Sequence, residues 1–389
     1  MANELNLVID FNNFAMRSLF TCQFMEPDVK INRFDTQKEI DVLVRKITMD
    51  ICRVVRTFTP KRVIIACDAH NAWRHEIYKE IDGEDYKGNR ERSDERNWDN
   101  IFSALSDLMD ILKDNGFIVT YLDNTEADDI AAMWKEYSWA NNNDIILVSS
   151  DMDWVQLVGM SDGNNVCACL NPIANNKGIK RFYMDEAVLN WVNEDEKPDI
   201  FFKTYNQTRK SIKNAHNADN KIQFEVIDPN MVLLNKVMAG DRGDNVPAFW
   251  DYYRNGKKQN VTELKAKHVF EALDVHNIND LIRVNESMML KDALEKEMKH
   301  EVDVDFHDRM YRQRRLVELK SELFPKNIVD NFYKFVSENA DKCTVNTAQV
   351  RMDDIVSGTK YEPKKSPEGK MNSIFDDIDS LSKYSVKLF

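Results

Sequence analysis

The sequence predicts an α/β fold with a mostly parallel central sheet flanked by helices, followed by a helical C-terminal lobe. Up to residue 200, short apolar runs alternate with longer segments of helical periodicity, which is typical of parallel sheets wrapped by helices. After a polar stretch, helical patterns continue to about residue 338. The chain of 389 residues is long enough for two or three domains. We therefore expect an α/β core at 1–200, a helical lobe at 201–338, and a linker with a terminal tail at 339–389.

Four apolar runs in the first 200 residues read as buried strands that lead into acidic side chains. The runs are Leu5–Ile9, Val63–Cys67, Phe117–Leu122 and Ile145–Val148. Because the carboxyl ends of parallel strands share one edge of a sheet, where ligands bind, we expect one polycarboxylate pocket there. A pair such as Asp151 and Asp153 can share a metal ion or merely cap the next helix, and spacing alone leaves both open. The acids after the four runs are Asp10, Asp68, Asp123, Glu126, Asp128, Asp129, Asp151 and Asp153.

Four segments have helical periodicity. Lys38–Thr57 would connect the first strand to the second, and Trp98–Leu112 the second to the third. Ile130–Ala140 follows the third strand, with Thr125 as its expected N-cap. Met231–Met238 would open the helical lobe.

Composition indicates a soluble protein of a reducing compartment, so we expect a cytoplasmic location. Hydrophobic residues make up 43% and charged residues 31%, and no apolar run approaches the ~20 residues that span a bilayer. The N-terminus has no secretory pattern, and the six cysteines lack zinc-site spacing. The net charge of −13 counts only weakly against a nucleic-acid partner, because the expected site itself contains many of the acids.

Between residues 69 and 97 the hydrophobic pattern fails. A segment of this length without a core face, next to the expected pocket, indicates a functional lid, and a disordered surface loop is the alternative. Aromatic residues interleaved with basic ones favour contact with nucleic acid. These residues include Trp73, Arg74, Lys79, Tyr86, Lys87 and Arg90.

The second half of the chain contains two polar segments and one glycine-rich turn. Residues 201–230 read as an exposed insertion, and 357–370 has linker composition. Asp241 and Asp244 lie in a turn with Gly240 and Gly243, whose backbone amides can face outward. Beyond the linker, Ile374, Ile378 and Leu381 would share one face of a short helix, which could dock on a partner or on the protein itself.

Six motifs in this order make the chain similar to the flap endonuclease, or 5′-nuclease, superfamily. Within it, the chain most resembles the ribonuclease H branch of T-even bacteriophages, over about residues 5–338. The glycine-rich turn that many relatives carry after the Gly-Asp motif is absent, and Phe249–Tyr253 and a loop at Asn255–Asn260 replace it. The motifs are Asp10, Asp68, Tyr86-Lys87-Gly88-Asn89-Arg90, Glu126-Ala127-Asp128-Asp129, Ser150-Asp151-Met152-Asp153 and Gly240-Asp241-Arg242-Gly243-Asp244-Asn245.

The resemblance implies a PIN-like 5′-nuclease core with two Mg²⁺ ions, for which Mn²⁺ can substitute. One ion would be held by Asp10, Asp68, Asp128 and Asp151. Asp153 and Asp241 would approach the second, with Glu126, Asp129 and Asp244 acting through water. Lys87 and Arg90 would reach the scissile phosphate from an arch formed by residues 72–97. The turn at 241–245 and the helix after it would form a helix-turn-helix-type element that holds duplex phosphates. The implied nucleic-acid contacts are Trp73, Arg74, Lys79, Tyr86, Lys87, Arg90, Arg242, Gly243, Lys257, Lys258, Lys265 and Lys267.

The function implied by the resemblance is magnesium-dependent, structure-specific 5′-3′ nuclease activity. Substrates would be DNA and RNA–DNA duplexes with 5′ ends or flaps, and the role would be removal of RNA primers and adjacent DNA during lagging-strand replication. The enzyme would be a monomer in the cytoplasm, that of a bacterial host if it is of phage origin. Residues 371–389 would bind a sliding clamp or a single-strand-binding protein. The alternatives are a catalytically silent nucleic-acid binder and a phosphatase with an aspartate nucleophile at Asp151.

Overall fold

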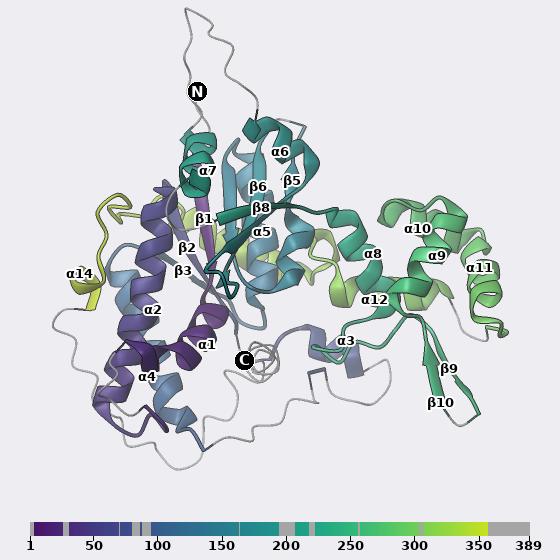
Figure 1. The fold of residues 1–389 in the computed structure, drawn as a ribbon, viewed down its shortest axis with the longest axis horizontal. Helices are drawn as coiled ribbons and strands as arrows, with labels where there is room; N and C mark the ends of the chain where they lie inside the picture. Colours follow the sequence, from purple (N-terminus) through teal and green to yellow (C-terminus); the bar gives the residue numbers. More distant parts are fainter. Residues whose placement is uncertain are drawn as a thin grey trace, which may run out of the picture. The chain divides into compact units, whose positions relative to one another are not determined.

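The computed structural model describes residues 4–25, 31–69, 71–79, 86–87, 95–162, 164–193, 207–217, 222–255, 257–302 and 306–356, which belong to two compact units (Figure 1). The first unit takes Met1–Ala72, Glu91–Ile227 and Lys326–Phe389. The second takes Trp73–Arg90 and Asp228–Pro325. This division differs from the expected one, because the helix at Lys326–Asn339 and the polar stretch before residue 227 belong to the first unit.

The first unit contains the sheet. Among the described residues its strands run in the order β3-β2-β1-β4-β6-β7-β8, with β5 paired to β6. The pairs β1–β2, β1–β4, β2–β3, β4–β6 and β7–β8 are parallel, and β5–β6 and β6–β7 are antiparallel. Strands β1 and β4 are buried throughout, which explains their apolar sequences. The strands are β1 Leu5–Asp10, β2 Arg62–Cys67, β3 Ile118–Tyr121, β4 Asp144–Val148, β5 Gly159–Met160, β6 Val166–Ala174, β7 Lys180–Met184 and β8 Ile222–Val226.

Helices cover the sheet, as the sequence predicts. The first helices, α1, α2 and α4, pack on one another, while α5 packs on β1, β2 and β4 and contacts α13. Trp134 of α5 meets Phe332 of α13 with their ring centroids 5.7 Å apart. The helices of this unit are α1 Phe11–Thr21, α2 Gln37–Phe58, α4 Trp98–Asp114, α5 Ala127–Ala140, α6 Glu186–Asn193, α7 Gln207–Asn217, α13 Lys326–Asn339 and α14 Met352–Val356, with short 3-10 turns η1 Cys22–Phe24 and η2 Met152–Leu157.

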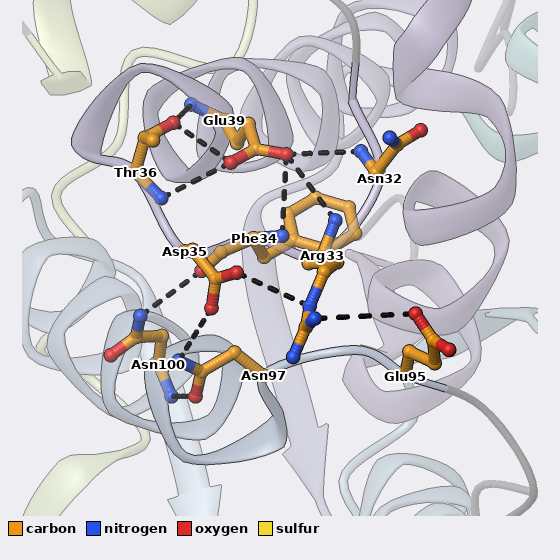
Figure 2. Close-up of polar contacts among 9 residues, drawn as sticks. All are labelled: Asn32, Arg33, Phe34, Asp35, Thr36, Glu39, Glu95, Asn97 and Asn100. Atoms are coloured by element: carbon orange, nitrogen blue, oxygen red, sulfur yellow. Dashed lines mark hydrogen bonds and ion pairs between the residues drawn. The ribbon is translucent and has the colours of Figure 1, made fainter.

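A buried carboxylate organises the start of α2 (Figure 2). Glu39 accepts hydrogen bonds from the backbone N–H groups of residues 32, 33, 34 and 36, at 2.9 to 3.3 Å, and from the Thr36 hydroxyl at 2.8 Å. Thr36 in turn caps the helix, which completes a capping box. The same turn holds the chain before α4, because Asn97 N–H donates to the Arg33 carbonyl at 2.6 Å.

Two segments that the sequence analysis treated as exposed or as linker pack on the first unit. Within the expected insertion, α7 buries Ile212 and Ala215, and β8 pairs in parallel with β7. Residues 340–356, expected to begin the linker, follow the surface of the unit and end in α14. Thr344 N–H donates to the Gly116 carbonyl at 3.1 Å. A Cβ atom on Gly116 would lie 2.1 Å from the Thr344 hydroxyl oxygen, so only glycine allows this approach.

The second unit is mostly helical. Its core includes Leu234, Val237, Phe249, Leu281 and Leu294, each no more than 2% exposed. None of the described helices in either unit is long and apolar enough to cross a membrane. The elements of this unit are α3 Arg74–Lys79, α8 Pro229–Ala239, β9 Asp251–Arg254, β10 Lys257–Asn260, α9 Glu263–Leu273, α10 Ile278–Glu286, α11 Met289–Met298, α12 Phe306–Val317 and η3 Ser321–Leu323.

Candidate active site

The acids of the first unit lie where the strand order of the sheet reverses. Strand β1 ends at Asp10, and its neighbour β4 ends at Val148, directly before Ser149. The chain crosses from β1 to β2 on one side and reaches β4 on the other side only after β3. In open α/β sheets, ligands bind beyond the carboxyl ends of the strands at such a switch point. The fold thus puts Asp10 and Asp151 at the position where a binding site is expected.

Ser149 connects these two segments. Its hydroxyl donates to Oδ2 of Asp10 at 2.6 Å and accepts from the Asp151 N–H at 3.0 Å. Asn13 makes a second connection, because its N–H donates to Oδ1 of Asp10 at 3.0 Å while its side-chain oxygen accepts from the Ser150 N–H at 3.2 Å. Ser149 and Asn13 are site residues that the sequence analysis missed. Their signal was available, since small polar residues directly follow β1 and β4.

Asp68 and Asp128 are oriented by the start of α5 and by a tryptophan. Oδ1 of Asp68 accepts from the Ala127 N–H at 2.6 Å. Oδ1 of Asp128 accepts from the indole N–H of Trp154 at 2.6 Å. Trp154 is fully buried and lies in η2, which follows Asp151. Hydrogen bonds therefore connect the carboxyl ends of β2 and β4 to the first turn of α5, with both carboxylates partly exposed.

Glu126 and Asp129 have a different environment from their neighbours. Helix α5 begins at Ala127 with Glu126 as N-cap, so the expected start at Ile130 and the expected cap Thr125 are wrong. Oδ2 of Asp129 accepts from the Glu126 N–H at 3.1 Å, and Asp129 has no exposed surface. An acidic side chain at the third position of a helix can accept from the free N–H groups at the helix start. The sequence analysis placed the start from apolar periodicity alone and therefore placed it too late in the chain.

Capping of helices does not use up the oxygen atoms of these carboxylates. Asp151 caps η2 by accepting from the Asp153 N–H at 2.9 Å, as the capping alternative expected, and Asp10 likewise caps α1. A carboxylate oxygen has two lone pairs and can still accept another partner. The donors are hard oxygens, which suit Mg²⁺. Within the described part of the chain, however, no three acidic, histidine or cysteine side chains converge closely enough to hold one ion.

The second unit contains its own charged group. The Lys87 N–H donates to the Asp244 carbonyl at 3.2 Å, and Nζ of Lys87 lies 3.8 Å from Oδ2 of Asp244. The Tyr86 hydroxyl also donates to Oδ2 of Asp244, at 3.2 Å. Lys87 is buried and its φ of 58° is left-handed, so the Asp244 turn and the aromatic ring of Tyr86 hold it in a restricted conformation.

Asp241 is held as an anion at the same turn. It accepts from the Gly243 N–H at 2.7 Å and forms an ion pair with Lys236. Burial raises the pKa of Asp241. The charge of Lys236 and the hydrogen bonds lower it by more than burial raises it, so the net pKa lies below its usual value. The turn itself is closed by reciprocal backbone hydrogen bonds between Asp241 and Val246.

Trp73 and Arg74, which the resemblance gave as nucleic-acid contacts, are buried inside the second unit. They are 5% and 2% exposed, and the Arg74 guanidinium lies 4.7 Å from the centre of the Trp73 ring. Nε of Arg74 donates to the Leu316 carbonyl of α12 at 3.0 Å. The expectation that 72–97 lacks a core face is therefore wrong for its first part, α3. Arg90 and the side chain of Lys79 lie outside the described residues.

The helix expected after the Asp241–Asn245 turn is α9, and it does not follow the turn directly. An antiparallel hairpin, β9 and β10, comes first, and α9 follows it. Of the basic residues expected here, Lys257 and Lys258 lie on β10, and Lys265 and Lys267 lie on α9. The sequence analysis described 255–260 as a loop, because its polar composition carries no strand pattern.

Comparison with known proteins shows which family part of the chain resembles. Residues 6–190 match the family model of the 5′-3′ exonuclease N-terminal resolvase-like domain. This part of the chain is similar to the 5′-3′ exonuclease family. The match spans Asp10, Asp68, the acids at the start of α5, and Asp151 and Asp153.

Individual relatives agree with the family. A 5′-3′ exonuclease of Mycoplasmopsis pulmonis is 24% identical over 232 residues, which are 59% of this chain and 60% of that protein. The chain thus spans about three fifths of that relative's length. A bacteriophage T5 flap endonuclease variant, in complex with DNA and metal ions, superimposes with a TM-score of 0.52 and 17% identity, covering 87% of this chain and 99% of the other. The T5 protein co-crystallized with metal ions superimposes with a TM-score of 0.50 and 16% sequence identity, covering 87% of this chain and 100% of the other. At these identities the two structures establish the fold.

Proposed function

We propose that this chain is a magnesium-dependent, structure-specific 5′-3′ nuclease that acts as an exonuclease and flap endonuclease. The observation that carries the proposal is the hydrogen-bonded network of Asp10, Ser149 and Asp151 at the switch point, inside the region that matches the exonuclease family. Orienting bonds to Asp68 and Asp128 support it. An arrangement in which buried neighbours fix several carboxylates is typical of a metal-assisted hydrolase.

Asp10, Asp68, Asp128 and Asp151 would hold the first Mg²⁺, and Asp153 would approach the second. When bound, such ions activate a water and stabilise charge on the attacking and leaving oxygens of a phosphodiester. The chain's own groups orient this site: Ser149 holds Asp10, Ala127 N–H holds Asp68, and the Trp154 indole holds Asp128. Glu126 and Asp129 shape the helix start that presents Asp128.

Assignments in the second unit stay predictions from the resemblance. They are Asp241 at the second ion, Asp244 through water, and Lys87 and Arg90 at the scissile phosphate. Charged donors there would place positive charge on the non-bridging oxygens as the transition state forms. The structure gives Lys87 a carboxylate partner, Asp244, with a separation of 3.8 Å. An arriving phosphate would compete with that carboxylate for the ammonium group.

The proposed substrates are DNA and RNA–DNA duplexes with 5′ ends or flaps, recognised by shape through phosphate contacts. Removal of RNA primers and adjacent DNA during replication is the proposed role, and the ribonuclease H branch of phage enzymes is the proposed relationship. The enzyme would act as a monomer. Residues 371–389 lie outside the described residues; we propose that they bind a sliding clamp or a single-strand-binding protein, and their deletion should spare cleavage of short substrates and abolish that binding.

Cleavage of a 5′-labelled flap and of a nicked RNA–DNA duplex, with and without Mg²⁺, tests the proposal. We expect short labelled products only with the metal, and their loss in Asp151→Asn. Asp162→Asn, an exposed carboxylate elsewhere in the first unit, is the matched control. A gel shift of the flap substrate without any cleavage would instead establish a catalytically silent nucleic-acid binder. Metal-dependent release of phosphate from a monoester, without cleavage of either duplex, would establish a phosphatase.

A further inference from the structure

A cavity of about 960 Å³ lies between α2, the start of β3 and residues 344–355. All of these parts belong to the first unit. Helix α14 contacts both α2 and α4, and Figure 1 shows it beside α2. Phe117, one of the lining residues, directly precedes β3, so the cavity lies at the amino-terminal edge of the sheet. It is therefore separate from the acids, which follow the carboxyl ends of the strands.

Part of the cavity wall is apolar. Met49 of α2, Val345 and Met352 of α14 line it, and each of these side chains is only partly buried. Binding sites in proteins have volumes of about 300–1000 Å³ and walls that combine apolar side chains with a few polar ones. Because apolar surface gains free energy when it leaves water, this wall favours an occupant with apolar side chains of its own.

The rim of the cavity is cationic. Arg56 of α2 and Arg351 both line it, and Arg56 donates to the Val350 carbonyl. Both arginines are exposed, and within the described part of the chain neither forms an ion pair with an acid. Among the described residues that line the cavity, one is an acid, Asp354. Since complementary charge favours the correct partner, the occupant should carry an excess of acids beside its apolar side chains.

The C-terminal tail, residues 357–389, has a segment of this composition. The tail lies outside the described residues, so its sequence alone indicates what it can bind. Ile374, Ile378 and Leu381 have the i, i+4, i+7 spacing with which an amphipathic helix fills a groove. No basic residue lies between positions 371 and 382. The acids of the segment are Asp376, Asp377 and Asp379.

We propose that the cavity between α2 and α14 binds residues 374–381 of the same chain, with the apolar face of this segment on the wall and its acids at the arginine rim. The tail starts directly after α14, which itself lines the cavity. Residues 357–373 form the connection, and a flexible chain of that length has a root-mean-square span of roughly 23 Å. Such a tether gives an effective concentration in the millimolar range, so weak contacts suffice.

The inference deepens the proposed function. The same tail is proposed to bind a sliding clamp or a single-strand-binding protein, and one segment cannot occupy two surfaces at once. A partner protein would therefore have to displace the segment from the cavity, which would keep the tail covered until that partner is present.

Photo-crosslinking in the full-length protein tests where the segment lies. Benzoylphenylalanine in place of Phe375 reacts with neighbouring C–H bonds on illumination, and mass spectrometry locates the joined peptides. We expect crosslinks within one chain, to residues 344–355 or to α2 around Met49. Absence of crosslinks, crosslinks elsewhere on the chain, or crosslinks between two copies would each overturn the inference. The last result would identify a second copy as the partner of the tail.

A charge reversal tests the arginine rim. On a helix Asp377 lies beside both Ile374 and Leu381, which makes it the acid next to the apolar face. Docking protects the backbone amides of 374–381 from hydrogen exchange. In full-length protein, Arg351→Glu and Asp377→Arg should each speed their exchange by about fivefold, the upper range for one exposed ion pair. The combined variant Arg351→Glu/Asp377→Arg should restore the slow exchange.

Lys342→Glu is the matched control, because Lys342 is an exposed cation of the same segment that is not among the lining residues. Its exchange should equal that of the wild type. Unchanged exchange in both single variants, or a combined variant that is not restored, would overturn the inference. Asp377→Arg lies outside the folded core, so its result holds even if Arg351→Glu folds poorly.

Cleavage of the flap substrate separates this inference from the proposed function. Because the cavity is at the opposite edge of the sheet from the acids, Arg351→Glu should cleave a short flap at the wild-type rate. Wild-type protein that cleaves but shows no crosslinks and no protection would overturn the docking inference alone. Wild-type protein that does not cleave would overturn the nuclease proposal, and the crosslinks would still report on the tail.

Discussion

Ser149 donates its hydroxyl proton to Oδ2 of Asp10 over 2.6 Å, and the two residues belong to adjacent parallel strand ends. Ser149 is 1% exposed and Asp10 is 5% exposed, so water cannot easily replace either partner. The contact joins the first and fourth strands of the sheet at the edge where the acids gather. It fixes one carboxylate oxygen and leaves that oxygen's second lone pair for another partner.

Ser149→Ala should therefore weaken the site without unfolding it. Groups that orient a metal ligand typically matter by 10–100-fold, so we expect a fall of about that size in metal-dependent cleavage and a higher Mg²⁺ concentration at half-maximal rate. Ser18→Ala is the matched control, because Ser18 is equally buried in α1 and its hydroxyl has no partner among the described residues. Equal activity of the two variants would show that Ser149 does not position Asp10.

Trp154→Phe should reduce activity more than its effect on folding explains. The substitution removes the 2.6 Å hydrogen bond to Asp128 and leaves a small cavity. The matched control is Trp134→Phe, also fully buried, which loses a 3.1 Å bond to the Thr120 hydroxyl instead. Both should lose about 1–3 kcal/mol of unfolding free energy in urea, and only Trp154→Phe should lose about tenfold or more in kcat. A comparable loss of kcat in both would argue against a role for the indole in orienting Asp128.

Mg²⁺ should raise the thermal midpoint of the protein. Ions that bind only the folded state stabilise it, by about 2.7 kcal/mol at a hundred times the dissociation constant. Asp68→Asn keeps an oxygen to accept from Ala127 N–H while removing one charge, so it should fold normally and show a smaller Mg²⁺ shift. Asp162→Asn should keep the full shift. A Mg²⁺ titration without any change in the midpoint would contradict the metal site.

Glu39→Gln should destabilise the first unit by about 2–3 kcal/mol. Oε2 of Glu39 accepts from the Thr36 N–H, and in the variant an amide NH₂ group, itself a donor, would face that N–H. Burial raises the pKa of Glu39, but its hydrogen bonds lower it more, so the net pKa lies below 4.5. A carboxylate whose pKa is lower in the folded than in the unfolded state stabilises the fold at pH values above its unfolded-state pKa. This stabilisation is lost as the pH falls through the folded-state pKa.

The difference in unfolding free energy between Glu39→Gln and the wild type should accordingly be full at pH 6 and shrink below pH 4.5. Urea titrations at pH 6, 4 and 3 measure it, with the exposed Glu338→Gln as control. A difference that is constant over this range would mean that Glu39 is not held as an anion.

The strands and their acids were predictable because both follow from local pattern. Leu5–Asp10 is apolar and then acidic, and a buried parallel strand requires that order when a ligand edge follows. The same reasoning predicted that Asp68, Asp128 and Asp151 lie at one edge of the sheet. Among the described residues, however, no three acidic, histidine or cysteine side chains come close enough to hold one metal ion. The helix periodicity of Trp98–Leu112 was equally local, and α4 covers it.

Errors arose where burial depends on partners distant in sequence. Trp73 and Arg74 have the composition of a nucleic-acid contact, yet α12, more than 230 residues later, supplies Leu316 to accept from Arg74. Residues 207–217 and 222–226 are polar because they form a helix and an edge strand that each bury only a few side chains. No local pattern predicts either outcome, since each depends on a surface made by another part of the chain.

The close approach of Thr344 to Gly116 has a practical consequence for shortened versions of this enzyme. Residues 340–356 close over α2, where the Val350 carbonyl accepts from Arg56 and Ile355 is 5% exposed. Truncation at residue 339, where the sequence pattern alone suggested the folded part ends, would strip that cover from apolar side chains and invite aggregation. A cut after residue 356 keeps it, and only a protein trimmed there isolates the contribution of the remaining C-terminal residues.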